Sequence, residues 1–481
     1  MGANSLRWYH RLALVGSVGL CFVASAANAQ TAVPDSQFGS QGFTLVQPPA
    51  GYDNFETIAL LPAPSNAYTA VAGAHIVNAF GPSFGVALVR VSATGALDAS
   101  FQSGGIRVRD TFGAKNKALF SVVAACTDPQ GKIVVAGQAP GTDGQSTDTF
   151  LARFNTDGSD DASFGTDGFL TLNLANTAQI HSDVPTDVLC RSDGAIVVTG
   201  NFTYPNEFGS PNSGPALALV SDNTILYSNL PLEFGNKRAA TLSADAGNTV
   251  WQVVVQSGAV NLRQFDQQLM VVTGSSINLP PCAGTNPALM IAPFKATPVD
   301  PANGEIQLVG AANDPISGVH EVSAARIDTI HRTAACSILG EFPSVNGPSA
   351  IATAIARSPT RLYVAATFGF GGSFYYTELG KTYVGAYDLT AMFPTFVPAM
   401  EFTASTAYNI EYPPPPSSVT NPSDVATALL WDNRQGHEDL VVGGSHADTY
   451  DPHVSSMDYT SVARLANTDL LFRDGFDFDN F

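Results

Sequence analysis

Charged side chains are scarce in this sequence of 481 residues: only 13% are Asp, Glu, Lys or Arg, against about 25% in an ordinary soluble protein. Basic residues are the scarcer class, with 22 Lys and Arg against 41 Asp and Glu, so the formal net charge is −19. A phosphate backbone attracts a positive surface, and we therefore expect no nucleic-acid partner. Disordered chains combine low hydrophobicity with high charge, whereas 45% of this chain is hydrophobic. The composition predicts a folded, acidic protein.

Long apolar runs are also missing: after residue 30 no stretch approaches the roughly 18 uninterrupted apolar residues of a membrane-spanning helix. We expect no membrane span. Residues 1–29 have the three parts of a signal peptide, namely Arg7 and Arg11, an apolar segment at 12–24, and an A-x-A cleavage site at 27–29. We therefore expect cleavage before Gln30 and export to the periplasm, the cell surface or the extracellular space.

Cysteine is rare, and cleavage would leave four of the five: Cys126, Cys190, Cys282 and Cys336. An exported protein can form disulfides. Four cysteines in so long a chain are nevertheless no disulfide framework, and their spacing alone gives no pairing. We favour buried free thiols, with disulfides as the alternative.

The sequence does contain an internal repeat. Apolar runs that end in a small residue recur about every 60 residues. They lie at 67–73, 131–137, 194–200, 304–310, 360–366 and 438–444, with a weaker copy at 248–254. Turn signals precede most of them, at 128–131, 192–194, 243–248, 300–304 and 432–436, and second apolar runs follow at 84–95, 148–158, 382–390 and 459–469. Since no segment has a convincing helical period, we predict four strands in each unit.

Seven such units predict one all-β domain over residues 30–471, followed by a short tail at 472–481. A solenoid and a propeller would both show this period. Residues 34–43 match the tail of the second unit at 160–169 but lack the hairpin that should precede it. The last unit, with its third strand at 461–469, lacks that tail. We therefore predict a seven-bladed β-propeller, closed by an N-terminal strand that completes the last blade, and we expect a monomer.

The segment FLARFNTDGSDDASFGTDG at 150–168, with GKIVVAG at 131–137 just before it, resembles the delta-60 repeat family, a group of secreted bacterial β-propellers of unassigned function. The resemblance is sharp at 34–200 and 459–469, while units four to six depart from the family pattern. It implies a propeller and export, and it supplies no catalytic residues.

Two short motifs match patterns known from functional sites, but a structural role explains each of them better. GPSFG at 81–85 matches the G-x-S-x-G nucleophile elbow, but a strand pattern follows Ser83 where the elbow needs a helix. SADAGNTVW at 243–251 nearly matches the Asp-box turn of sialidase-like propellers, which stabilises a hairpin. We assign no catalytic and no cofactor-binding residues.

Two clusters carry side chains that could bind metal ions. NTDGSDD at 155–161 could offer carboxylate oxygens to calcium, although Asp-Gly is common in hairpin turns. The last unit has residue types that suit zinc: His437, His446, Asp448, Asp451 and His453. Their spacing fits no known site. We expect no metal site and no cofactor, with calcium left open.

The interval before the last unit is the longest, and it is rich in tyrosine and proline. Its tyrosines are Tyr375, Tyr376, Tyr383, Tyr387, Tyr408 and Tyr412, and PPPP lies at 413–416. Exposed aromatics beside prolines can form a binding surface, and 400–422 is our candidate for a functional loop. Ordinary strands with a long connector are the alternative.

Without a catalytic constellation, the repeat favours a binding or scaffold module for an extracellular ligand, which could be a glycan, a peptide or a surface partner. The alternative is an exported hydrolase or lyase with carboxylates at the mouth of a central channel. Titratable side chains that converge there, with a raised carboxyl pKa, would favour the enzyme. The ending FRDGFDFDNF could be a sorting signal or the frayed end of the last blade.

Overall fold

The computed structural model describes most of the repeat region. The described residues are 35–40, 42–77, 83–112, 118–141, 143–177, 179–205, 211–227, 237–256, 259–283, 289–313, 320–339, 349–369, 382–389, 404–409, 423–434, 439–447 and 458–465. Helical turns are confined, within this part, to α1 (Gln102–Gly105) and η1 (Pro64–Asn66). The predicted signal peptide and C-terminal tail lie outside the described residues.

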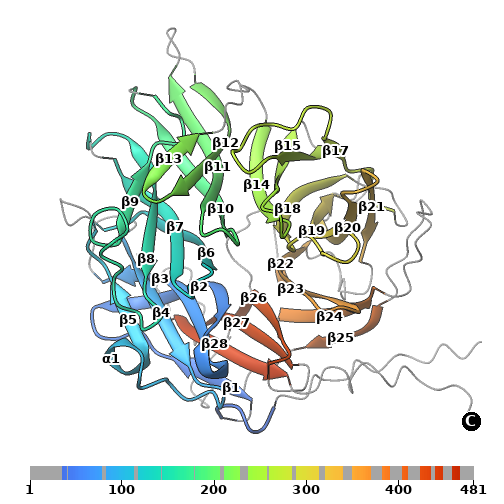
Figure 1. The fold of residues 1–481 in the computed structure, drawn as a ribbon. Coiled ribbons are helices and arrows are strands. Elements are labelled where there is room, and N and C mark those ends of the chain that lie inside the picture. Colours follow the sequence, from blue (N-terminus) through green and yellow to red (C-terminus); the bar gives the residue numbers. More distant parts are fainter. Residues whose placement is uncertain are drawn as a thin grey trace, which may run out of the picture.

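Strands pair in antiparallel groups of four, which surround a common centre (Figure 1). The first strands, nearest the centre, are β2 (Tyr52–Pro62), β6 (Ser121–Thr127), β10 (Ser182–Cys190), β14 (Lys237–Ala244), β18 (Met290–Ala296), β22 (Ser349–Arg357) and β26 (Ser423–Asp432). The second strands are β3 (Tyr68–Ile76), β7 (Ile133–Pro140), β11 (Ile196–Pro205), β15 (Val250–Gln256), β19 (Glu305–Asn313), β23 (Arg361–Gly369) and β27 (Asp439–Ala447). The last strand of one group and the first strand of the next are consecutive in the chain.

The third strands are β4 (Phe84–Val91), β8 (Thr147–Phe154), β12 (Pro211–Ser221), β16 (Ala259–Phe265), β20 (His320–Asp328), β24 (Thr382–Asp388) and β28 (Asp458–Leu465). The outer strands are β5 (Ile106–Arg109), β9 (Phe169–Leu172), β13 (Thr224–Tyr227), β17 (Ile277–Asn278), β21 (Thr333–Ile338), β25 (Ala404–Asn409) and, beside β28, β1 (Phe43–Val46). Each predicted apolar run overlaps a second or third strand of its group.

Apolar side chains fill the spaces between neighbouring groups. Val71 of β3 and Leu88 of β4, for example, belong to the same buried cluster as Val135 of β7 and Phe150 of β8. Each first strand also contacts the first strands of the groups on either side, and β26 contacts β2. Twisted four-stranded sheets that pack face to face around a centre form a β-propeller, which confirms the predicted all-β propeller fold.

The turns between first and second strands lie where the sequence predicted them. In the turn after β6, Asp128 Oδ1 accepts hydrogen bonds from the backbone N–H groups of Gln130 (2.9 Å) and Lys132 (2.8 Å). Asp245 Oδ1 likewise accepts from Thr249 N at 2.8 Å. These carboxylates satisfy backbone donors that a tight turn would otherwise leave unpaired. Much of the acidic character of the chain therefore serves its turns.

In the second repeat, contacts between three side chains hold the segment at 160–169 against the third strand, β8. The Arg153 guanidinium lies 4.5 Å from the centre of the Phe164 ring, and Arg153 Nε donates to Asp161 Oδ2 at 2.6 Å. Burial would raise the pKa of Asp161, but hydrogen bonds from Lys132, Ser163 and Arg153 hold it well below its usual range. The segment at 160–169 is therefore held to β8 by an ion pair.

Arg464 makes the same contacts with the N-terminal segment, across 429 residues of sequence. Its guanidinium lies 4.9 Å from the centre of the Phe38 ring, and its Nε donates to Asp35 Oδ2 at 2.7 Å. Asp35 N donates to Arg464 O at 2.8 Å. β1 follows and pairs with β28, with Phe43 opposite Ala463. The N-terminal strand is thus the outer strand of the group that begins with β26.

Glycine is required at equivalent positions of these two segments. Gly39 and Gly165 both have φ of +54°, and a Cβ would lie 2.1 Å from Phe43 O in the first case and 2.2 Å from Phe169 O in the second. Real Cβ atoms do not approach a carbonyl oxygen so closely, and positive φ disfavours side chains. Glycine therefore follows phenylalanine in both segments because any larger residue would clash with the backbone.

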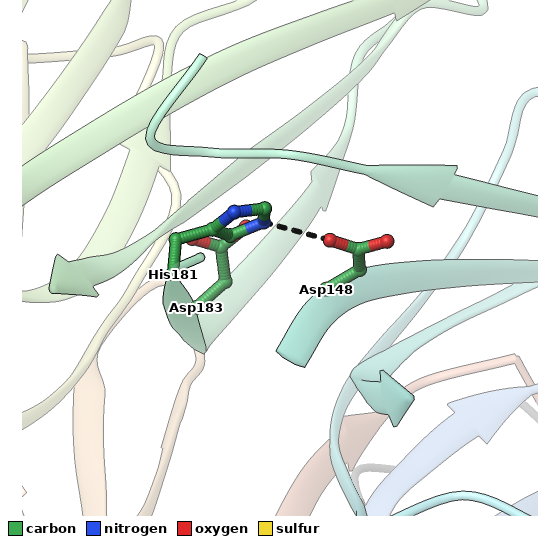
Figure 2. A group of neighbouring side chains, drawn as sticks. All are labelled: Asp148, His181 and Asp183. Atoms are coloured by element: carbon green, nitrogen blue, oxygen red, sulfur yellow. Dashed lines mark hydrogen bonds and ion pairs between the residues drawn. The ribbon is translucent and has the colours of Figure 1, made fainter. Parts of the chain in front are cut away.

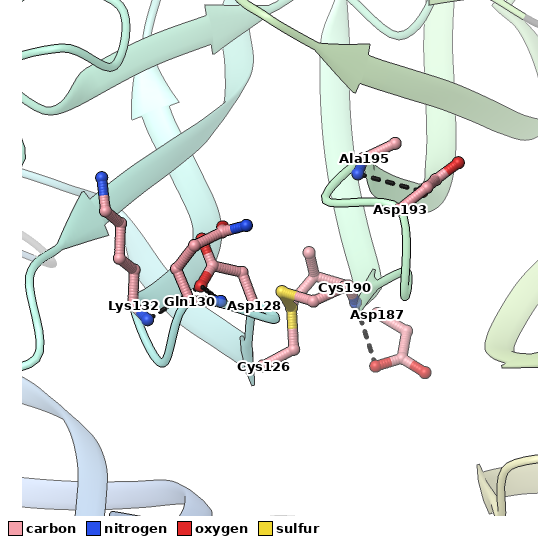
Figure 3. Close-up of a disulfide and its surroundings, with 9 residues drawn as sticks. Cys126, Asp128, Gln130, Lys132, Asp187, Cys190, Asp193 and Ala195 are labelled. Atoms are coloured by element: carbon pink, nitrogen blue, oxygen red, sulfur yellow. Dashed lines mark hydrogen bonds between the residues drawn. A yellow bond between two sulfur atoms is a disulfide. The ribbon is translucent and has the colours of Figure 1, made fainter.

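The expectation of free thiols is wrong. The described chain has disulfides between Cys126 and Cys190, with Cα atoms 5.7 Å apart, and between Cys282 and Cys336, with Cα atoms 4.2 Å apart. The partners are separated by 64 and 54 residues, which is one repeat. Residues one repeat apart occupy equivalent positions in adjacent groups and can therefore lie side by side. Figure 3 shows the first bond, which joins the ends of β6 and β10.

Replacing Asp35 with Ala is expected to lower the free energy of unfolding by about 3 kcal/mol, because a buried guanidinium loses its main carboxylate partner. Asp161→Ala removes the same contact within one repeat and is the matched control, with a similar expected loss. Urea denaturation of both variants measures the effect. If Asp161→Ala destabilises the protein and Asp35→Ala does not, the pair with Arg464 does not hold the N-terminal segment.

Replacing both Cys126 and Cys190 with Ala is expected to cost about 2–4 kcal/mol of stability, because the bond constrains a long loop of the unfolded chain. Replacing Cys282 and Cys336 should have an effect of the same order. Thermal unfolding under oxidising and reducing conditions tests this. A reductant should lower the unfolding temperature of the wild type and leave unchanged that of a variant lacking all four cysteines.

Candidate functional site

Three titratable side chains, Asp148, His181 and Asp183, meet between two neighbouring groups of strands (Figure 2). Asp148 is the second residue of β8, His181 immediately precedes β10, and Asp183 is the second residue of β10. Thr147 and Ser182 are paired in parallel, which sets the starts of β8 and β10 side by side. The propeller topology thus joins residues that lie far apart in the sequence.

The loop before β8 supports the backbone of His181. Ser146 Oγ donates to Asp143 Oδ2 at 2.6 Å and accepts a hydrogen bond from His181 N at 3.1 Å. The Ser146 hydroxyl and the Ser146 and Gln145 backbone N–H groups lower the pKa of Asp143 to about 2. Thr147 N donates to His181 O at 2.9 Å. Backbone hydrogen bonds on both sides therefore fix the position of His181.

Both ring nitrogens of His181 face oxygen atoms. Nδ1 lies 2.9 Å from Gln179 O, and because a carbonyl oxygen can only accept, Nδ1 carries a hydrogen. Nε2 lies 2.8 Å from Asp148 Oδ1 and 4.0 Å from Asp183 Oδ2. Burial opposes the charged ring, but the Gln179 carbonyl and the two carboxylates outweigh it and raise the pKa of His181. Nε2 is thus the ring atom that faces the cluster.

Asp183 is fully buried. Its Oδ2 accepts a hydrogen bond from Leu174 N at 2.6 Å, whereas its Oδ1 has no hydrogen-bond partner among the described residues. Burial raises the pKa of Asp183 to about 7, and the charge of Asp148 acts in the same direction, against the Leu174 N–H and His181. The cluster therefore holds two carboxyl groups that are costly to ionise together.

The cluster is closed to solvent, since the side chains of His181, Asp148 and Asp183 are 7%, 10% and 0% exposed. One ligand atom from each residue lies within 4.8 Å of the other two. A site of this kind can hold a proton or a small cation, and it presents no open position to a large substrate.

Three exposed apolar side chains adjoin the buried cluster, two along the chain and one through Gln138. Phe120, which precedes β6, is 37% exposed, and Ile180 and Val184 are 52% and 45% exposed. Gln138 connects the two first strands, because its backbone O accepts from Phe120 N at 2.9 Å and its Nε2 donates to Asp183 O at 2.5 Å. We call Phe120, Ile180 and Val184 the apolar rim. It lies on the face where the first strands begin.

The acidic segment at 155–161 pairs with basic side chains of its own and the neighbouring repeat. Asp160 lies 3.3 Å from Arg107 Nη2 and 3.2 Å from Arg109 Nη1, and Asp161 is paired with Arg153. Asp157 Oδ1 accepts from Ser159 Oγ at 2.6 Å. These carboxylates therefore have local partners, and calcium at this position stays a sequence-based possibility.

Most of the other predicted candidates lie outside the described residues. Of the last-unit set His437, His446, Asp448, Asp451 and His453, only the backbone of His446 is described, in β27. Of 400–422, only β25 is described.

Three further candidates have structural positions. Tyr387 agrees with the alternative of an ordinary strand, because its side chain is 1% exposed and packs in the core. The strand expected after Ser83 is β4. The segment 243–251 forms the turn between β14 and β15, as expected.

Asp148, His181 and Asp183 are candidate functional residues that the sequence analysis missed. No motif joins them, since His181 is separated from Asp148 by the whole outer strand of the repeat. The usable signal was topological: a third strand and the next first strand begin on the same face, so polar residues at these two starts can meet.

Comparison with known proteins supports the architecture. A family model for a domain of unknown function (DUF5122) described as a beta-propeller matches residues 129–164, which contain β7 and β8. No curated protein matches the chain. No helix in the described part of the chain is both long and apolar enough to cross a membrane.

Several solved structures are similar to this chain, with sequence identities of 10–11%. A protein from Lactobacillus plantarum has 10% identity and a TM-score of 0.43, with 86% of this chain and 96% of that chain covered. The polysaccharide lyase Uly1 has 10% identity and a TM-score of 0.42, covering 94% and 95%. An α-L-arabinanase of Penicillium chrysogenum, complexed with arabinobiose, has 11% identity and a TM-score of 0.41, covering 89% and 98%.

Replacing His181 with Ala is expected to lower the free energy of unfolding by about 3–5 kcal/mol, because two buried carboxyl groups lose the group between them. His75→Ala is the matched control: His75 is 32% exposed and pairs with Asp53 at 2.6 Å. A partly exposed pair contributes about 1 kcal/mol or less. Equal losses for the two variants in urea denaturation would contradict the role assigned to the buried cluster.

Proposed function

We propose that this chain is an exported, closed seven-bladed β-propeller of the delta-60 type that acts as a binding module for a protein or peptide. The binding face is the one where the first strands begin, and the apolar rim of Phe120, Ile180 and Val184 contacts the partner. The observation that carries this proposal is the apolar rim, which lies beside polar side chains that are already buried and paired.

Closure is supported by contacts of the same kind at two places in the ring. Arg90 Nη1 donates to Thr156 O, in the next group along the chain. Arg464 Nη1 donates to Ala93 O at 2.7 Å, so the group that begins with β26 meets the first group through the equivalent residues. A ring in which the last and first blades pack like any other pair has no exposed sheet edge between them.

A rigid scaffold suits a binding module because little conformational entropy is lost on binding. Disulfides join neighbouring blades near the centre at Cys126–Cys190 and near the periphery at Cys282–Cys336. These bonds are compatible with export, because disulfides form and persist in oxidising compartments. The loops of the binding face are therefore presented by a covalently reinforced frame.

The chemistry of the exposed side chains favours a protein or peptide over a glycan. Phe120, Ile180 and Val184 are apolar, and such side chains at the centre of an interface are typical of protein partners. On the other face, the turns after the first strands bear carboxylates such as Asp128 and Asp245, which bind their own backbone. The binding face is thus the apolar one.

An exported hydrolase or lyase is the second candidate, favoured by one observation. Asp183 and His181 converge, and the pKa of Asp183 is raised to about 7, which suits a general acid. Burial opposes this role, since a catalytic acid must reach the substrate. Turnover of a polysaccharide or peptide that is lost in Asp183→Asn and retained in Ile180→Lys would favour the enzyme.

The binding proposal predicts that Ile180→Lys and Val184→Lys together abolish binding. The mature protein is applied to immobilised peptide and glycan arrays, and the double variant is compared with Ile330→Lys. Ile330 is 66% exposed in the turn after β20, on the opposite face. We expect peptide ligands that bind the wild type and Ile330→Lys but not the double variant. Absence of any wild-type ligand, or equal binding by all three proteins, would contradict the proposal.

A further inference from the structure

If both carboxyl groups are ionised, the cluster of Asp148, His181 and Asp183 carries two negative charges beside a neutral imidazole and one beside an imidazolium. Protons alone balance this charge only if Asp183 is neutral while His181 is charged. Unbalanced charge is costly where all three side chains are buried. A divalent cation would neutralise the two carboxylates and leave His181 neutral.

The orientation of His181 suits metal ligation. Its Nδ1–H is held by Gln179 O at 2.9 Å, so the lone pair of the neutral ring is on Nε2, which faces the two carboxylates. Metal-binding histidines generally donate their other ring N–H to a carbonyl or carboxylate, which fixes the tautomer and the ring plane. The hydrogen bond that would orient the histidine ligand is therefore already present.

An unsatisfied oxygen atom provides an independent indication. Asp183 Oδ1 is buried without a hydrogen-bond partner among the described residues, while Oδ2 of the same carboxyl group accepts from Leu174 N. Buried oxygen atoms without a partner are rare in native proteins, and a bound ion would satisfy this one.

We propose that Asp148, His181 and Asp183 bind one divalent first-row transition metal ion of the zinc class, which joins the start of β8 to the start of β10. Imidazole nitrogen with carboxylate oxygen suits such an ion better than calcium, which prefers an all-oxygen set. The site is closed by burial, so the ion is structural. This inference goes beyond the proposed partner binding and does not depend on which partner is bound.

The test is a metal titration of the untagged mature protein after treatment with a chelator. Isothermal titration with Zn²⁺ is expected to give one equivalent per chain, and Zn²⁺ is expected to raise the unfolding temperature. His181→Gln and Asp183→Asn should weaken Zn²⁺ binding at least about a hundredfold, since each removes a direct ligand. Co²⁺ should give visible absorption bands that are absent in His181→Gln.

His75→Gln is the matched control, because His75 pairs with a single carboxylate at 2.6 Å and should leave Zn²⁺ binding unchanged. Circular dichroism confirms that each variant is folded, and the wild-type titration needs no variant at all. No Zn²⁺ binding by the wild type, or equal binding by folded His181→Gln, would overturn the proposal. Calcium binding that survives in His181→Gln would also overturn it. None of these results depends on the peptide array, so the two proposals fail separately.

Discussion

The N-terminal segment and strand β28 are held together through one buried side chain, Arg464. Arg464 is 5% exposed. It binds Asp35 and lies over Phe38, and it also donates to the carbonyl of Ala93 in the turn after β4. One guanidinium therefore contacts both the N-terminal segment and the neighbouring group. Arg153 makes the same contacts within its own repeat, with Asp161 and Phe164. For Arg464 the carboxylate and the ring come instead from the N-terminal segment.

Parts of the sequence that lie far apart meet in the space between neighbouring sheets. β10 illustrates this at both ends. Its last residue, Cys190, is bonded to Cys126 of β6, and at its start Asp183 and the adjacent His181 lie against Asp148 of β8. A covalent bond fixes one end and a charged cluster the other. The apolar rim is attached to the second end, so its position depends on the same contacts.

The repeat could be predicted from the sequence because each cause is local. Apolar runs make second and third strands, Asp and Gly make turns, and the similarity of 34–43 to 160–169 already indicates that both segments bind a third strand. Gly39 and Gly165 show why the Phe-Gly pair recurs. These features need only the chain near each residue.

The cluster and the disulfides could not be predicted from the sequence in this way, because each depends on how one group of strands packs against the next. The spacing of 64 residues between Cys126 and Cys190 was a usable signal, since it equals one repeat. Asp148 and His181 have no such spacing, because they occupy a third strand and the approach to a first strand. Burial of Tyr387 could not be predicted either, because a tyrosine-rich segment suits a core strand as well as a binding surface.

Hydrogen exchange of the β1 amides tests most directly whether the two ends of the chain form one blade. Phe43–Val46 pairs with β28 as Phe169–Leu172 pairs with β8. The amides of β1 that bond to β28 should therefore exchange as slowly as those of β9 that bond to β8, and protection in β1 and β28 should be lost together as denaturant is added. Rapid exchange throughout 43–46, with β9 protected, would contradict a blade shared by the two ends.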